Sequence, residues 1–258
     1  MSETQLAPMS NGRMEMRIQR HDAHEAGHLT AEGQEHAKDI AQQTVNEYLD
    51  KNTDTHFLII NSDQPWDETE ANTGRRAQET GTIVADTIKA ELEKRELPEE
   101  QLFGHEDQDP STVSPVIREA DIFDNKFMAH LREKYPDENE WHMYYQDADA
   151  QEREGMHAES AMALARRMDY MIKTAEIAGA SFHKTPGNED KPLLVWIIGH
   201  GGGLDAYLHR YGGVPIDELG FPLSGGFTLR ANPNGEVVAD VKGKEYPIRT
   251  DESLNLPQ

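Results

Sequence analysis

The chain has 258 residues and a formal net charge of −23, from 48 acidic and 25 basic residues. This length suits one large α/β domain or two small ones, and the acidic excess argues against a nucleic-acid partner, because nucleic-acid-binding domains are usually basic. The absence of cysteine excludes disulfides, thiol catalysis and cysteinyl metal sites. The longest apolar run, residues 193–198, is too short to cross a membrane, so we expect a cytoplasmic protein with no membrane partner.

The N-terminal part of the chain predicts a strand, a loop and a helix. Residues 14–19 alternate apolar and polar side chains, as a strand does, and lead directly into Arg20 and His21. Thr30 is placed to cap a helix over residues 31–50, where apolar side chains recur at helical spacing. Units of this kind bind ligands beyond the carboxyl end of the strand. The arginine and histidine at that end are therefore a candidate oxyanion site.

A second strand and helix follow in the same order. Residues 56–60 form a short, mostly apolar run that predicts a central parallel strand buried on both faces, and Ser62 comes just after it. The next helix opens around Arg75 and Arg76 and runs to about residue 94. Cations in the first turn oppose the helix dipole, so arginines at this place indicate an anion to be held. We expect Arg76 to hold it and Arg75 to face solvent.

The middle of the chain carries weaker signals. Residues 102–103 predict a short strand. Residues 126–155 are rich in charge, tyrosine and tryptophan, and we interpret them as helical pieces that cap the site. A long helix is expected over residues 156–178, followed by a polar loop over residues 181–190, which contains a Pro-Gly pair.

The strongest strand prediction lies over residues 192–199, which run into His200 and three glycines before another helix. Glycines let backbone and ligand approach closely, and a helix start supplies free N–H groups for an oxyanion. We therefore expect His200 to lie in the site. Two closing strands are predicted over residues 226–230 and 235–241.

In this order, the motifs resemble those of the histidine phosphatase superfamily, also called the phosphoglycerate-mutase-like family. The resemblance covers about residues 14–241, and its matching segments are Arg20-His21-Asp22, Leu29-Thr30-Ala31-Glu32-Gly33, Arg76-Ala77-Gln78-Glu79-Thr80, residues 116–123, and His200-Gly201-Gly202. It implies an α/β fold, a three-layer α/β/α sandwich with a mostly parallel central sheet. One such domain would span residues 14–250 with a cap insertion around residues 126–155, after a disordered tail over residues 1–13.

The resemblance also implies roles for particular residues. His21 would be the nucleophile that forms a phosphohistidine, Glu119 the proton donor, and His200 a second essential histidine. The groups implied to bind the substrate phosphate are Arg20, Arg76, His200 and Ser62. Asp121 and Asp124 remain close competitors of Glu119. The implied reaction is metal-independent hydrolysis of a phosphomonoester, with no cofactor, on a small-molecule phosphate ester or a phosphoprotein; the sequence does not indicate the oligomeric state.

Three positions depart from the superfamily pattern. Asp22 stands where a glycine is usual, and its carboxylate would repel a phosphate dianion unless it points away or pairs with a cation. Gly81 replaces the alanine that ends the Arg76 motif. Gly27 stands where the mutases carry asparagine, so the loop favours a phosphatase over a mutase. Asp22 also keeps open a non-catalytic phosphate-binding or phosphoprotein-binding protein of the same fold.

A rival interpretation comes from residues 24–28, which read His-Glu-Ala-Gly-His. This HExxH pattern is typical of zinc metalloproteases, in which two histidines on one helical face bind zinc and the glutamate activates water. It requires residues 24–28 to be helical, whereas the phosphatase interpretation makes them a loop. Thr30 as a helix cap and Gly27 within the segment both favour the loop.

Overall fold

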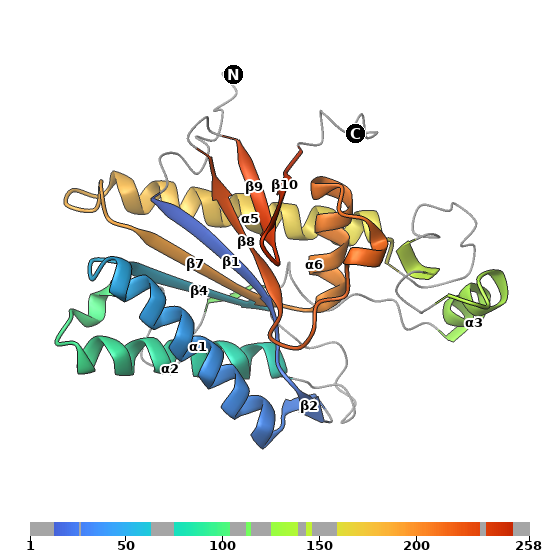
Figure 1. Ribbon diagram of the computed structural model, residues 1–258, viewed down its shortest axis with the longest axis horizontal. Helices are drawn as coiled ribbons and strands as arrows, with labels where there is room; N and C mark the ends of the chain where they lie inside the picture. The colour runs from blue at the N-terminus through green and yellow to red at the C-terminus, as the bar shows by residue number, and fades with distance from the viewer. Residues whose placement is uncertain are drawn as a thin grey trace.

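The computed structural model describes residues 13–25, 27–62, 75–103, 112–114, 125–138, 143–145, 159–232 and 236–249. These residues form an eight-stranded mixed sheet covered by helices, which confirms the predicted α/β class (Figure 1). The strand order is β10-β9-β8-β1-β7-β4-β5, and β6 also pairs with β4. The strands are β1 (Met14–Arg20), β4 (His56–Ser62), β5 (Leu102–Phe103), β6 (Thr112–Ser114), β7 (Leu193–Gly199), β8 (Gly226–Ala231), β9 (Val237–Val241) and β10 (Lys244–Pro247).

The parallel part of the sheet is its centre. Strand β7 lies between β1 and β4 and runs parallel to both, and β5 and β6 run parallel to β4. Every residue of β4 and of β7 is buried, as expected for central strands with helices on both faces. Beyond β1 the sheet becomes antiparallel through β8, β9 and β10.

Alternate side chains of the central strands enter two separate hydrophobic cores. On one face, Leu194, Trp196 and Ile198 of β7 join the core formed with α1 (Ala31–Lys51) and α2 (Arg76–Lys94). On the other face, Val195 and Ile197 join the core formed with α5 (Ala161–Lys184) and α6 (Gly201–Tyr207). The three layers are visible in Figure 1, with α1 and α2 below the sheet and α5 and α6 on the other side.

The predicted first helix agrees with the structure at its start and end. The Thr30 hydroxyl accepts a hydrogen bond from the Gly33 N–H, 3.0 Å away, so it caps the first turn of α1 as its type and position predict. The buried face of α1 carries the apolar residues that recur at helical spacing, including Ala41, Val45 and Leu49. The helix ends at Lys51, before Asn52 adopts an extended backbone.

The predicted loop over residues 181–190 is wrong in its first part. Helix α5 continues to Lys184 and stops at Thr185, the residue before Pro186. Phe182 stabilises this last turn, because its ring stacks on Phe103 of β5 at a centroid distance of 5.1 Å. The described start of α5 is capped by the Ser160 hydroxyl, and the expected start near residue 156 lies outside the described residues.

The sequence did not predict β10. Its residues, Lys244–Pro247, are short and polar, and only Tyr246 is buried. The strand forms because Lys242 and Gly243 both have positive φ, 54° and 82°, which makes a tight two-residue turn after β9. The Asp240 carboxylate accepts a hydrogen bond from the Gly243 N–H and supports this turn. The register is thus fixed by the turn rather than by apolar alternation.

The cap insertion is described only in part. Residues 125–138 contain α3 (Asn125–Lys134), and residues 143–145 contribute two buried tyrosines. The Tyr145 hydroxyl donates a hydrogen bond to the Gly202 carbonyl, 3.1 Å away, so this piece contacts α6. The expected tail over residues 1–13 lies almost entirely outside the described residues. None of the described helices has both the length and the apolar character needed to cross a membrane.

Candidate active site

The carboxyl ends of β1, β4 and β7 bring together residues from distant parts of the sequence. His21 follows β1, Ser62 ends β4 and His200 follows β7. The ring centroids of His21 and His200 lie 5.1 Å apart, and the Nε2 atom of His200 lies 3.1 Å from the Ser62 hydroxyl oxygen. All three side chains are buried. Parallel pairing with β7 in the middle is what places them at one edge of the sheet.

His21 is held with a single tautomer. Its Nδ1 atom lies 2.8 Å from the Asp22 carbonyl oxygen, and because a carbonyl can only accept, Nδ1 carries the proton. Nε2 therefore keeps its lone pair. Burial, together with the positive charge of Arg76, lowers the pKa of His21 to about 3, so the ring is neutral at pH 7. A neutral imidazole with one fixed tautomer can act as a nucleophile.

His200 carries a buried polar atom that needs a partner. Its Nδ1 atom is buried and has no hydrogen-bond partner among the described residues. Burial lowers the pKa of His200 well below its usual value, and the positive charges of Arg76 and Arg20 lower it further. Gly201 follows it, and a Cβ there would lie 3.3 Å from the Arg20 side chain. The glycine thus lets the start of α6 approach Arg20 closely.

Two arginines supply the positive charge at this edge of the sheet. Arg20 ends β1, and its Nη1 atom donates to the Phe221 carbonyl at 2.9 Å. Arg76 lies in the first turn of α2 and is partly buried, while Arg75 is exposed, as the sequence predicts. The charges of Arg76 and Arg20 lower the pKa of three histidines, His21, His24 and His200. Both guanidinium groups therefore act on the same small region.

Comparison with solved protein structures identifies the fold to which this chain is similar. No protein-family model and no curated protein sequence matches the chain. Among solved structures it is similar to a mycobacterial glucosyl-3-phosphoglycerate phosphatase, with 16% identity, a TM-score of 0.54, and coverage of 92% of this chain and 99% of that one. A second similar structure, called mycobacterial hydrolase 1, has 16% identity, a TM-score of 0.54, and coverage of 91% and 100%. The same phosphatase in complex with VO3 has 17% identity, a TM-score of 0.51, and coverage of 88% and 97%.

The chain has the histidine phosphatase fold. The resemblance inferred from the motifs is thus confirmed for the fold over nearly the whole chain. At this level of identity the comparison speaks for the fold alone, so the roles of individual residues depend on their geometry.

Asp22, which replaces the usual glycine of this fold, points its carboxylate into a set of donors. Its oxygens accept hydrogen bonds from the Ala23 N–H at 2.6 Å and from the Ser224 hydroxyl, and one lies 2.7 Å from His36 Nδ1. Its φ is not positive, since the only non-glycine residues with positive φ among those described are Glu96, Ser224 and Lys242. Both carboxylate oxygens are therefore engaged in local hydrogen bonds, and the backbone here does not require glycine.

Ser224 connects this network to the nucleophile. It has φ of +55° and is buried, a conformation that is uncommon for a residue other than glycine. Its N–H donates to the His21 carbonyl at 3.3 Å while its hydroxyl donates to Asp22. The sequence does not predict this role of Ser224, since no local pattern distinguishes it from other loop serines.

The HExxH interpretation is wrong. Residues 24–25 and 28–29 form two short antiparallel strands, β2 (His24–Glu25) and β3 (His28–Leu29), rather than a helix. Gly27 between them has φ of +82°, which a helix does not allow. His28 lies 2.6 Å from a Glu79 oxygen of α2 and does not share a helical face with His24. The geometry that this motif needs to bind zinc is therefore not formed.

The buried carboxyl of Asp205, which the sequence did not predict as part of the site, is connected to Arg20 through the backbone of Phe221. Asp205 of α6 accepts a hydrogen bond from the Gly220 N–H at 3.2 Å and is also hydrogen-bonded by the backbone of Phe221, whose carbonyl accepts from Arg20. Burial raises the pKa of Asp205 to about 6. In the sequence, this residue could have been recognised as the one acidic side chain in the otherwise apolar and glycine-rich segment Gly201–Tyr207.

The predicted proton donor cannot be placed. Glu119 and its competitors Asp121 and Asp124 lie outside the described residues. Their assignment stays a prediction from the sequence.

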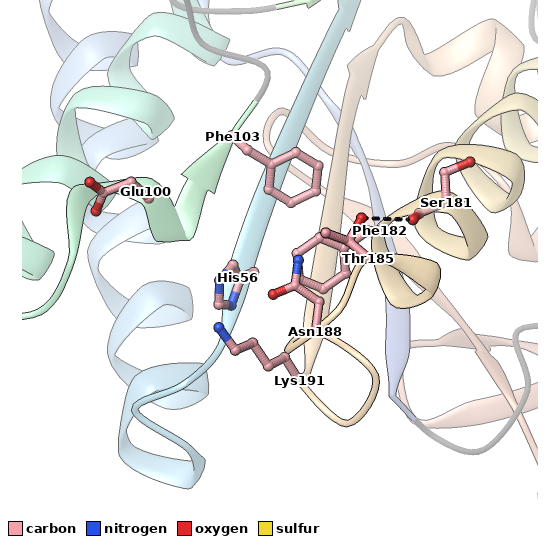
Figure 2. A pocket seen from close by; sticks show the side chains of 8 residues that line it. All are labelled: His56, Glu100, Phe103, Ser181, Phe182, Thr185, Asn188 and Lys191. Carbon is pink, nitrogen blue, oxygen red and sulfur yellow. Dashed lines mark hydrogen bonds between the residues drawn. The ribbon is translucent and has the colours of Figure 1, made fainter.

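An open cavity of about 480 Å³ lies at the other end of the parallel strands (Figure 2). It is lined by His56 at the start of β4, by Phe103 and Phe182, and by Lys191 ahead of β7, among others. Since β4 has seven residues, this end lies roughly 20 Å from the Ser62 end. The cavity is therefore separate from the cluster of His21, His200 and the two arginines.

Proposed function

We propose that the protein is a phosphomonoester hydrolase that works through a phosphohistidine at His21 and needs no metal ion. One observation carries the proposal: His21 is neutral, has Nδ1 bonded to a backbone carbonyl, and stands in the field of Arg20 and Arg76 beside His200. A nucleophile next to fixed positive charge suits attack on a phosphate monoester dianion. The similar solved structures support the same class, since two are named as a phosphatase.

The proposed reaction has two steps. The Nε2 lone pair of His21 attacks phosphorus in line, an N–P bond forms, and the P–O bond to the alcohol breaks. The leaving alkoxide takes a proton from an acid, which we assign to Glu119. Water then attacks the phosphohistidine, its proton passes to the same carboxylate, and inorganic phosphate leaves with His21 restored.

Arg20, Arg76, His200 and Ser62 are proposed to bind the phosphoryl oxygens. Fixed guanidinium groups would stabilise the charge that these oxygens carry in the transition state. The buried Nδ1 atom of His200 is a further hydrogen-bonding group that has no partner among the described residues. The positive charge that a metal ion would otherwise supply is thus provided by side chains.

Asp22 was the main reason to consider a non-catalytic phosphate-binding protein. Its carboxylate is bonded by Ala23, Ser224 and His36, so repulsion of a phosphate dianion is much reduced. The non-catalytic alternative loses its specific support, and hydrolysis is the better proposal.

The test is a panel of phosphate esters assayed with EDTA present. We expect turnover of at least one ester and an acid-labile, base-stable phosphoenzyme after rapid quenching. Glu119→Gln is expected to lower kcat more for alkyl esters than for an activated aryl ester, because only the alkoxide needs a proton. If no ester is hydrolysed while inorganic phosphate still binds, the proposal is replaced by the phosphate-binding alternative.

A further inference from the structure

His24, to which no role has been assigned, lies close to the proposed nucleophile His21. Its ring centroid is 5.0 Å from that of His21 at an interplanar angle of 67°, and that of His200 is 5.1 Å away at 61°. His21 is therefore flanked by two imidazoles at the same distance and in the same edge-on manner. Of these three rings, only His24 belongs to an exposed residue.

The hairpin that carries His24 is fixed to α2. The Glu79 carboxylate accepts from the Leu29 N–H at 2.7 Å and lies 2.6 Å from His28 Nδ1. The Gly27 carbonyl accepts from the Arg76 N–H at 3.0 Å. The hairpin and the first turn of α2 are thus one unit, and His24 and Arg76 are held in a defined relation to each other.

His24 differs from its neighbours on the same segment in having no hydrogen-bond partner among the described residues. His28 is bonded to Glu79, and His36 is bonded to Asp22. Both nitrogens of His24 are therefore available to a ligand. A side chain that is held in place, exposed and next to a nucleophile is well suited to bind the group that the nucleophile attacks.

We propose that His24 is a further phosphate-binding residue, which contacts the phosphoryl group of a monoester dianion from the solvent side. This inference rests on the proposed function for its ligand, but it concerns binding and can be tested without turnover. His24 would add one more hydrogen-bonding group to the proposed phosphate site, next to His21 and near Arg76 and Arg20.

The charges around His24 make its role dependent on the ligand. The titratable groups that face it are Arg20 at the end of β1, His21 just after it, Arg76 from α2 and His200 after β7. Burial and the positive charges of Arg76 and Arg20 lower its pKa, so it is neutral at pH 7 in the free protein. A bound phosphate dianion offsets those charges and raises the pKa of His24 again. Phosphate binding is therefore coupled to proton uptake on this ring.

The experiment compares binding of inorganic phosphate and vanadate to the wild type, His24→Phe, His24→Gln and the control His28→Gln. Calorimetry is expected to show phosphate affinity about 10-fold weaker in His24→Phe, the loss of roughly one hydrogen bond to a charged group. His24→Gln, which keeps a donor, should recover part of the affinity, and His28→Gln should stay within about twofold because His28 is bonded to Glu79. NMR titration of the imidazole resonances should show the His24 pKa rising when phosphate is added.

Unchanged phosphate and vanadate affinity in His24→Phe would overturn the inference, as would a His24 pKa that phosphate does not move. Circular dichroism and thermal unfolding of each variant check that the hairpin change leaves the fold intact. The proposed function fails separately: a wild type that binds phosphate through His24 but hydrolyses no ester refutes hydrolysis and leaves this inference standing. Conversely, a wild type that hydrolyses esters, together with unaltered phosphate binding in His24→Phe, supports the proposed function and refutes the role of His24.

Discussion

Two histidines at opposite ends of the central strands have the same local hydrogen bond and different surroundings. His21, after β1, donates from Nδ1 to the Asp22 carbonyl at 2.8 Å, and His56, at the start of β4, donates from Nδ1 to the Asp54 carbonyl at 2.8 Å. Burial lowers the pKa of both rings. A fixed tautomer and a neutral ring are therefore not what distinguishes the candidate active site.

The difference lies in the charged neighbours. Around His21 the guanidinium groups of Arg76 and Arg20 add positive charge. Around His56 the negative charge of Asp54 offsets the positive charge of Lys191, and the ring packs on Phe182 at a centroid distance of 5.0 Å. Figure 2 shows that side of the molecule, with the Lys191 and Phe103 side chains near His56. Among the described residues, the two guanidinium groups give the His21 end the stronger positive charge, which favours the proposed phosphate site there.

Both ends contain buried polar atoms without a hydrogen-bond partner among the described residues. At the His56 end, Gln101 Nε2 donates to the carbonyls of Thr53 and Thr55 at 2.7 and 2.8 Å, but its buried Oε1 has no such partner. At the His21 end, the Asn61 amide and His200 Nδ1 are buried without a partner among the described residues. Each such group destabilises the fold by about 1–3 kcal/mol. Since such atoms occur at both ends, they do not by themselves distinguish the candidate active site.

Exchange of each histidine for glutamine gives the largest expected difference. His21→Gln is expected to lower kcat by about 10⁴-fold or more and to abolish the phosphoenzyme, because the nucleophile is lost. His56→Gln should stay within about twofold, since surface and remote changes rarely matter more. Ester hydrolysis and acid-quench trapping measure both. Equal activity of the two variants would remove His21 from the mechanism.

The adjacent arginines of α2 offer the next matched pair. Arg76→Met is expected to lower kcat/KM by about 10²–10³-fold, the typical loss when one group that stabilises transition-state charge is removed. Arg75→Met should change it less than about twofold, because Arg75 is exposed and makes no side-chain cap bond. Steady-state kinetics of both variants and the wild type on one ester measure these changes in kcat/KM. A loss of similar size in both variants would mean that general charge, rather than the site, is responsible.

The acid dependence of stability should also separate the two ends. Because the pKa of His21 falls to about 3 on folding, the unfolded chain binds one more proton between about pH 6.5 and pH 3, and stability falls as the pH falls through that window. His21→Gln lacks this titrating group, so between pH 7 and 4.5 its free energy of unfolding should fall by about 2.5 kcal/mol less than that of the wild type. His56→Gln should flatten the dependence less, since Asp54 opposes the effect of burial.

Urea unfolding in phosphate-free buffer at the two pH values measures these differences. The wild type serves as the reference at each pH, so that protonation of the many carboxyl groups cancels. If His21→Gln lost as much stability on acidification as the wild type, His21 would titrate normally in the folded protein.

Local patterns were enough to predict the elements that place the site. Each of these signals lies within a few residues: the alternation before Arg20, the Thr30 cap and the apolar run that ends at Gly199. Because the carboxyl ends of parallel strands lie at the same side of a sheet, the residues that follow the two strands are expected to lie close together. The expected fold followed from these. The predicted partners of the phosphate are brought to one edge, although their roles stay proposals.

The features that sequence missed depend on contacts between distant residues. The Asp22 carboxylate is hydrogen-bonded to His36 and Ser224, which lie 14 and 202 positions further along the chain. The HExxH segment forms a hairpin because Glu79, 51 positions after His28, bonds to it. No window on the sequence contains both members of such a pair, so local signals favoured a loop over residues 24–28 but did not predict the hairpin.

The smallest effect concerns Gly81, which replaces the alanine usual at the end of the Arg76 motif. In a helix interior, alanine is normally more stabilising than glycine by about 1 kcal/mol. Here a Cβ at position 81 would overlap the Asn61 side chain, which is fully buried between β4 and α2. Gly81→Ala is therefore expected to destabilise the protein by about 1–3 kcal/mol, as overpacking of a core does.

A double-mutant cycle shows whether Asn61 is the cause. Asn61→Ala removes both the overlap and an unsatisfied amide, so Gly81→Ala should be neutral or stabilising in that background, and urea unfolding should give a coupling energy of about 1–3 kcal/mol. Additive effects would mean that the glycine is required for another reason. If the coupling is found, a buried polar side chain at the carboxyl end of β4 accounts for a departure from the usual pattern of the fold.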